Sequence, residues 1–154
     1  MTDDRRLIED YLPIEAISKE ASREKSVRKG HISTLHLWWA RRPLVACRAA
    51  VYGALVPASQ FVPANGPDNK KQSLGRANAA RFVTELCKYP GSPRVIKQAQ
   101  EHILEAHAAR LTAELEQWHG LPARDNDRQA ACPTWVDEFK WPKDKAKVTR
   151  ADIE

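Results

Sequence analysis

The chain has 154 residues, with 25 Lys or Arg against 20 Asp or Glu and a formal net charge of +5. This length suffices for one domain with a hydrophobic core and is too short for two domains of ordinary size. Residues 1–10 lack the apolar core of a signal peptide, and no apolar stretch is long enough to cross a membrane. We therefore expect a cytoplasmic protein without membrane contact, whose charge is compatible with nucleic-acid binding.

The first predicted helix begins near Pro13, because proline is tolerated in the first turn, and runs toward Arg28, with Gly30 as its stop. A second helix begins at Pro43. Its apolar residues at three- and four-residue steps are Leu44, Cys47, Val51 and Leu55. We expect this stripe to face a core.

Residues 57–72 are rich in Pro, Asn and Gly and lack periodicity, which predicts a loop. A third helix is expected to follow Ser73 and to run to about Lys88. Ser92 has the features of an N-cap, with Pro93 in the first turn of a long helix that Gly120 closes.

On this long helix an apolar stripe is expected to pack against a core or another helix, and Arg110 and Glu114 are expected to form a surface pair. The stripe consists of Leu104, Ala108, Leu111, Leu115 and Trp118.

The tail, residues 121–154, has weak periodicity but carries the aromatic residues Trp135, Phe139 and Trp141. Such side chains need burial, either by the helices of this chain or by a partner; alternatively the tail begins further structure. The pattern as a whole predicts a mainly α fold. It is a small helical domain with long irregular loops and an irregular C-terminal tail, and its segments are 1–56, 57–72, 73–120 and 121–154.

The most informative segment is the basic aromatic run, Arg23 to Arg48, in which seven Arg or Lys residues accompany one acid and the pair Trp38 and Trp39. Basic charge interleaved with aromatic rings is typical of a surface that holds a polyanion or a planar ligand. The two tryptophans point in different directions on a helix or a strand. They are either core residues or a shelf for an adenine ring or an unstacked base.

If Pro43 opens a helix, Arg41 and Arg42 lie at its N-terminus, where the helix dipole already presents positive charge. Two cations there are unfavourable unless an anion is present, such as a phosphate, a ligand carboxylate or a protein Asp or Glu. Arg48, one turn after Leu44, adds to this charge or covers apolar surface with its stem.

Three cysteines at wide spacing and histidine pairs five residues apart lack the spacing of a metal site, so no metal is expected. The chain also contains no carboxylate pair, no Ser/His/Asp set and no glycine loop for phosphate. No catalytic residue is therefore predicted.

The stretch from Leu7 to Val56, and above all the motif STLHLWWARRPL (residues 33–44), resembles the N-terminal domain of unknown function that opens a family of large predicted adenine-specific DNA methylases. Some members of that family carry a zinc ribbon, and some lie in phage-defence clusters. The resemblance covers about the first third of the chain. It implies a module of an enzyme that moves a methyl group from S-adenosylmethionine to adenine N6 in DNA.

The same resemblance implies site residues. A segment that ends in a basic residue, Pro and Leu opens a helix beside the cofactor pocket of such enzymes. The implied cofactor-binding residues are Trp38, Trp39, Arg42, Pro43 and Leu44. The residues expected to contact nucleic acid are Arg23, Lys25, Arg28, Lys29, His36, Arg41 and Arg48.

The chain departs from the family in lacking both the glycine-rich cofactor loop and the Asn/Asp-Pro-Pro-aromatic catalytic tetrapeptide. It is therefore expected to be inactive alone, to bind S-adenosylmethionine only with a catalytic domain in cis or trans, and to have DNA as its other partner. Two alternatives stay open. One is an independent nucleic-acid-binding module. The other is a protein-interaction module whose arginines pair with the acids of residues 3–24, in either case serving a defence system.

Overall fold

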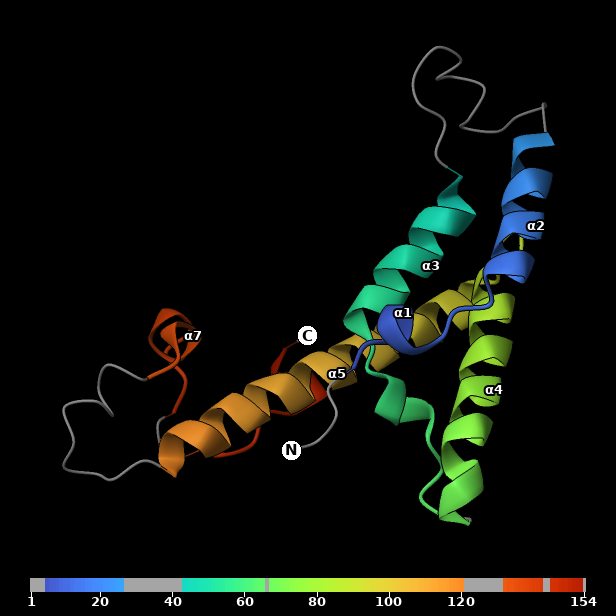
Figure 1. The fold of residues 1–154 in the computed structure, drawn as a ribbon. Helices are drawn as coiled ribbons and strands as arrows, with labels where there is room; N and C mark the ends of the chain where they lie inside the picture. The colour runs from blue at the N-terminus through green and yellow to red at the C-terminus, as the bar shows by residue number, and fades with distance from the viewer. Residues whose placement is uncertain (1–4, 27–42, 66, 121–131, 143–144, 154) are drawn as a thin grey trace. The chain divides into compact units, whose positions relative to one another are not determined.

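The structure is a computed structural model that describes residues 5–26, 43–65, 67–120, 132–142 and 145–153. Its helices are α1 (Leu7–Asp10), α2 (Ile14–Ser26), α3 (Leu44–Leu55), α4 (Asp68–Leu86), α5 (Pro93–His119) and α7 (Thr134–Glu138), with the short 3₁₀ helices η2 (Ala58–Phe61) and η3 (Arg150–Asp152) (Figure 1). Within these residues there is no β-strand, and a single isolated bridge joins Arg6 and Pro57. The predicted mainly α fold is confirmed.

The ends of α5 lie where the capping residues of the sequence predict them. α5 begins at Pro93, and the Ser92 carbonyl accepts the hydrogen bond of Ile96 N–H at 3.0 Å. The prediction for α4 was wrong at its start, because the helix begins at Asp68 inside the segment expected to be a loop. The Pro67 carbonyl accepts hydrogen bonds from the N–H groups of Lys70 and Lys71, so α4 begins directly after Pro67. The sequence suggested that this proline was part of the loop.

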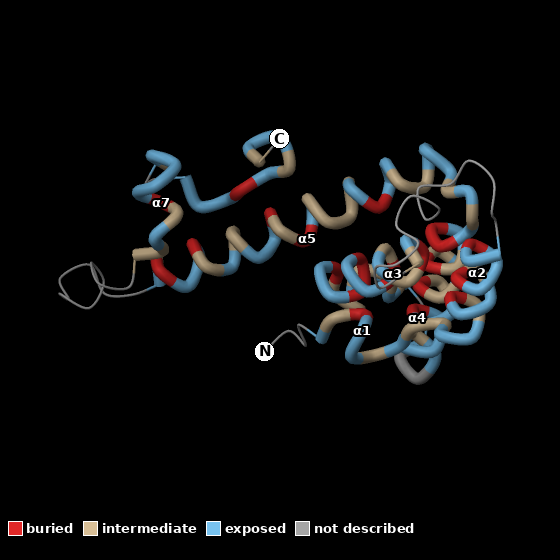
Figure 2. The backbone as a smooth tube through the Cα atoms, turned by 90° about the horizontal axis from the view of Figure 1, so that it is seen from above, coloured by how far each residue is buried: buried red, intermediate tan, exposed pale blue. Residues whose placement is uncertain are grey.

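The chain divides into two compact units, residues 1–103 and 104–154, and the boundary lies inside α5. The core of the first unit is built around α3. Its buried residues come from α1, α2, α3, α4 and the first turns of α5 (Figure 2). They include Leu7, Ile17, Ala21, Val45, Ala49, Tyr52, Val56, Ala79, Val83, Leu86 and Ala99.

The face of α3 that enters this core is not the predicted one. Leu44, Cys47, Val51 and Leu55 are all exposed, whereas Val45, Ala49, Tyr52 and Val56 are buried. Both sets follow three- and four-residue steps along a helix that is apolar nearly all round. Periodicity alone therefore could not choose between the two faces, and contacts with α1 and α2 decide which one is buried.

Tyr52 is the largest side chain in this core and is 2% exposed. Its hydroxyl lies 2.7 Å from Nδ1 of His102, and the rings of Phe61 and Phe82 pack against the same histidine. Burial raises the pKa of the Tyr52 phenol. The phenol therefore keeps its proton at neutral pH and can donate it to the imidazole.

The second unit packs the C-terminal half of α5 against the tail. Leu115, Trp118 and Ala108 are buried there, as the stripe on the long helix predicted, together with Val136 and Val148 of the tail. Trp135 donates its indole N–H to Glu114 at 2.8 Å, and its ring packs edge-on against Trp141. Trp135 and Trp141 are therefore partly buried in this second cluster, whereas Phe139 stays 76% exposed.

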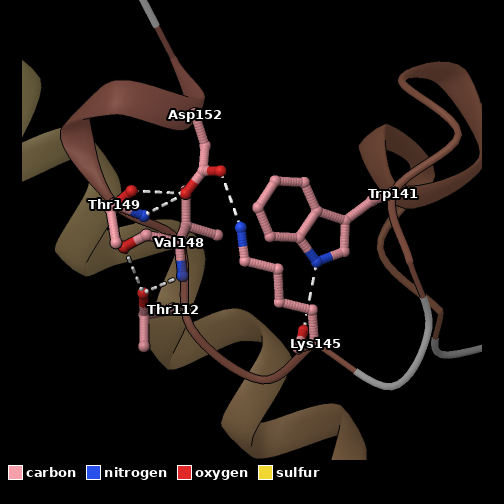
Figure 3. Close-up of polar contacts among 6 residues, drawn as sticks. All are labelled: Thr112, Trp141, Lys145, Val148, Thr149 and Asp152. Atoms are coloured by element: carbon pink, nitrogen blue, oxygen red, sulfur yellow. Dashed lines mark hydrogen bonds and ion pairs between the residues drawn. The ribbon is translucent and has the colours of Figure 1, made fainter.

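Residues 145–153 are held to α5 by the hydroxyl of Thr112, which accepts the Val148 N–H at 3.0 Å and lies 3.2 Å from the Val148 carbonyl (Figure 3). In the same view Asp152 accepts hydrogen bonds from Lys145 at 2.6 Å and from the backbone N–H of Thr149 at 2.8 Å. These contacts, led by the one from Lys145, lower the pKa of Asp152 to about 2.

A folded-state pKa below the unfolded value means that Asp152 stabilises the fold above pH about 3.9, and that this contribution is lost as the pH falls toward 2. Replacing Lys145 with methionine should raise the Asp152 pKa toward its ordinary value, as measured by NMR titration of the carboxyl carbon. Lys147→Met is the matched control, because Lys147 is exposed and has no ion-pair or hydrogen-bond partner among the described residues. A pKa that stays near 2 in Lys145→Met would contradict this account.

Lys140 has a φ of 51°, which is the left-handed region that glycine prefers. Lys140 lies just after α7, at the position where a residue with positive φ commonly ends a helix. There the Trp141 N–H donates a hydrogen bond of 2.8 Å to the Val136 carbonyl of α7. Lys140→Gly should therefore raise the free energy of unfolding by about 1 kcal/mol in urea denaturation. Lys147→Gly, at a backbone without positive φ, should lower it instead. The same sign for both variants would refute the prediction.

Candidate nucleic-acid interface

The N-terminus of α3 is occupied by a carboxylate of the protein itself. Glu24, at the end of α2, accepts the N–H of Leu44 through Oε1 and the N–H of Val45 through Oε2, both at 3.0 Å. Glu24 is only 3% exposed. The first N–H groups of a helix have no partner within the helix, and the dipole favours negative charge there. Of the anions that the sequence left open at this position, the structure contains a protein glutamate.

Two of the residues implied to bind cofactor can be placed. Pro43 is the half-buried N-cap of α3, and Leu44 is 50% exposed although its N–H is engaged by Glu24. The other three, Trp38, Trp39 and Arg42, lie outside the described residues.

Three of the residues expected to contact nucleic acid can also be placed. Arg23 is exposed on α2, with Nη1 3.7 Å from Oε1 of Glu20, and Lys25 is exposed nearby on the same helix. Arg48 lies on α3. The remaining candidates, Arg28, Lys29, His36 and Arg41, fall outside the described residues.

Arg48 binds the end of a neighbouring helix. Its Nη1 donates a hydrogen bond of 2.8 Å to the Leu86 carbonyl in the last turn of α4, where free carbonyls and the dipole favour a cation. Arg6 makes the same kind of contact with α3, donating to the Leu55 carbonyl at 3.2 Å. Both guanidinium groups are therefore bound to helix carbonyls, a role that the sequence did not predict for Arg48.

The carboxylates of the first unit are largely engaged inside it. Glu20 accepts the Tyr89 N–H and Glu9 accepts the Arg6 N–H, so backbone donors hold these two as they hold Glu24. Asp10 is bound by Arg76, and Glu85 by Lys88. Acids committed in this way are less able to neutralise the surface cations around them.

Several cations of the same unit have no such partner. In its described part, six exposed basic side chains form neither a hydrogen bond nor an ion pair, namely Lys19, Lys25, Lys70, Arg81, Arg94 and Lys97. The sequence agrees with this distribution. Residues 1–103 contain 17 basic and 10 acidic residues, a net charge of +7, whereas residues 104–154 contain 8 and 10, a net charge of −2. The positive charge of the chain therefore resides in the first unit.

Asp10 and Arg76 join α1 to α4 through two hydrogen bonds of 3.0 and 2.7 Å, which lower the pKa of the carboxyl group. They line a cleft of about 140 Å³ together with Arg5, Tyr11 and Gly75. This volume is below the 300–1,000 Å³ usual for the pocket of a drug-sized ligand. The cleft is therefore a poor fit for a molecule as large as S-adenosylmethionine.

The three cysteines of the chain all lie in its described part. No group of three or more His, Cys, Asp or Glu residues there could hold a metal ion. Cys87 is buried, and burial raises the pKa of its thiol to about 11, so it is protonated at neutral pH. Cys47 is exposed on α3, and Cys132 is half-buried.

Part of the chain matches a known family of proteins. Residues 11–82 match the model of a family described as "Protein of unknown function (DUF1156)", which covers a little less than half of the chain. No curated protein and no solved structure matches the chain. None of the described helices is long and apolar enough to cross a membrane. The expectation that the N-terminal region forms a domain of unknown function is thus confirmed, over residues 11–82.

Proposed function

We propose that this chain is a DNA-binding module of an S-adenosylmethionine-dependent DNA adenine methyltransferase, and that it is inactive without a catalytic domain in cis or trans. The observation that carries the DNA part is the unbalanced charge of the first unit. Among the described residues, five of its carboxylates are held by backbone N–H groups or by paired cations, while six exposed basic side chains there form no hydrogen bond or ion pair. A surface of this kind attracts phosphate groups.

The methyltransferase part rests on the resemblance of residues 33–44 to the opening domain of predicted adenine-specific methylases. S-adenosylmethionine would belong to the catalytic domain. Within this chain the N-terminus of α3 is already filled by Glu24, so its first two N–H groups are not free for a ligand carboxylate. We therefore assign the basic residues of the first unit to DNA in preference to the cofactor.

The test is the binding of a labelled duplex and a labelled single strand across a salt series, with Arg41→Ala/Arg42→Ala as the variant. If both arginines contact phosphates, the slope of log K against log salt should become shallower by about 1.8 for duplex DNA. The matched control is Arg110→Ala/Lys147→Ala, which removes two cations from the acidic second unit. Equal losses in both double variants would mean that only net charge matters, and no binding at low salt would refute the proposal.

The second candidate function is a protein-interaction module. It predicts that arginines of the chain pair with the acids of residues 3–24. Such pairs occur among the described residues, between Arg23 and Glu20 and between Asp10 and both Arg5 and Arg76. In that case the chain would bind a protein partner, and DNA binding would be absent at any salt concentration.

A further inference from the structure

The cleft between α1 and α4 is formed by elements that are joined to one another within the first unit. The N–H of Ala58, in η2, donates a hydrogen bond of 2.9 Å to the Arg5 carbonyl just before α1. The chain after η2 packs closely on α4, where a Cβ atom on Gly75 would lie 3.0 Å from a methyl group of Val62. Together with the ion pair that joins α1 to α4, these contacts hold the walls of the cleft. The fold itself therefore forms the cleft.

Polar side chains without partners lie around this cleft. The hydroxyl groups of Tyr11 and Ser59 and the side-chain amide of Gln72 form no hydrogen bond within the described residues. Arg76 uses Nε and Nη2 to bind Asp10, so its Nη1 has no partner there either. The rest of the lining is mostly apolar. A mostly apolar cleft with a few convergent polar groups is the usual form of a ligand site.

The volume and the charge of the cleft restrict what it can hold. A cavity of about 150 Å³ takes one benzene molecule, so this cleft of about 140 Å³ has room for one six-membered ring. Its charged lining residues are Arg5, Arg76 and Asp10, so positive charge is in excess. A flat ring that is attached to a phosphate group fits both restrictions.

The hydrogen-bonding groups of the cleft favour a ring that carries acceptors. The Asp10 side chain is only 8% exposed, and both of its oxygens are bound by Arg76. Nη1 of Arg76 can only donate, whereas the Gln72 amide can donate or accept. A pyrimidine base carries carbonyl oxygens that accept such hydrogen bonds. A purine has a second fused ring, for which this cleft lacks room.

We propose that this cleft binds one unpaired pyrimidine base of a DNA strand, with the ring beside Tyr11 and its edge toward Arg76 and Gln72. Aromatic side chains stack on the bases of single strands, and hydrogen bonds to the base edge add selectivity. The sugar and the phosphate stay outside the cleft, where the Arg5 side chain is 49% exposed. The inference rests on the proposed function, because it names the part of the DNA that the first unit binds besides phosphate groups.

The first experiment compares a labelled oligothymidine with a strand of the same length that carries abasic sugars, using the full chain. Both strands have the same phosphate groups, so only the bases differ. The oligothymidine should bind about tenfold more tightly. Equal, salt-sensitive binding of the two strands would overturn the inference and leave the proposed function standing, whereas no binding of either strand would overturn both. Thymidine monophosphate bound as tightly as the oligothymidine would mean that the ligand is a free nucleotide, and the assignment to DNA would fail.

The second experiment locates the base in the cleft. Tyr11→Ala should remove most of the preference for the oligothymidine, and Phe139→Ala is the matched control, since Phe139 is a 76% exposed aromatic residue outside the cleft. Gln72→Ala should weaken oligothymidine binding several-fold without changing the abasic strand. Its control is Gln98→Ala, because Gln98 is exposed on α5 and forms no hydrogen bond within the described residues. Melting temperatures show whether each variant is folded. An unchanged preference in folded Gln72→Ala and Tyr11→Ala would overturn the proposal, and if Tyr11→Ala does not fold, Gln72→Ala alone decides.

Discussion

Replacing Glu24 with glutamine is expected to lower the free energy of unfolding by about 2 kcal/mol, and replacing it with alanine by about 3 kcal/mol. Each oxygen of the buried carboxylate accepts one backbone N–H of α3. An amide has a single oxygen, so in Glu24→Gln one N–H would face an NH₂ group. Alanine leaves both N–H groups without a partner and removes the charge that the helix dipole favours. Urea unfolding followed by circular dichroism measures both values.

Glu15→Gln is the matched control for Glu24. Glu15 lies on the same helix but is exposed and forms neither an ion pair nor a hydrogen bond within the described residues. Its replacement should change stability by no more than a few tenths of a kcal/mol. If both glutamine variants have the same small effect, Glu24 does not hold the start of α3, and that position would again be open to an external anion.

Val45→Ala is expected to lower the free energy of unfolding by about 2 kcal/mol, whereas Val51→Ala should leave it unchanged or slightly raised. The two valines lie on the same helix but are 1% and 56% exposed. Removing two buried carbons costs about 1.6 kcal/mol in transfer free energy, to which a cavity adds. At position 51 there is little burial to lose, and alanine has the better helix propensity.

The measurement is thermal and urea unfolding of both variants at concentrations where the chain is monomeric. It decides directly which face of α3 enters the core. Equal destabilisation by the two variants would mean that both faces are buried. A larger effect at Val51 would restore the face that the periodicity first suggested.

The comparison of α5 with α3 shows what the sequence could predict. Ser92, Pro93 and Gly120 act locally, through backbone hydrogen bonds and allowed dihedral angles, so both ends of α5 could be predicted. α5 carries one apolar stripe on a partly polar helix, and this stripe sufficed to predict that Leu115 and Trp118 are buried. On α3 almost every residue is apolar, so the buried face depends on contacts with α1 and α2, which are distant in sequence.

The sequence could predict that an anion lies at the start of α3, but not which residue supplies it. The presence of an anion at the start of α3 followed from a conflict between Arg41, Arg42 and the helix dipole. That Glu24 supplies it depends on the pairing of α2 with α3, for which the sequence carries only one signal, the single acid within the basic aromatic run. The contact of Arg48 with Leu86 likewise joins residues 38 positions apart.

The contact of Glu24 with Leu44 and Val45 also joins the end of α2 to the start of α3. It joins the two ends of residues 25–43, the nineteen residues that contain most of the basic aromatic run. The two hydrogen bonds of the buried carboxylate therefore fix the ends of this segment to each other, so the basic aromatic run begins and ends at the same place in the first unit.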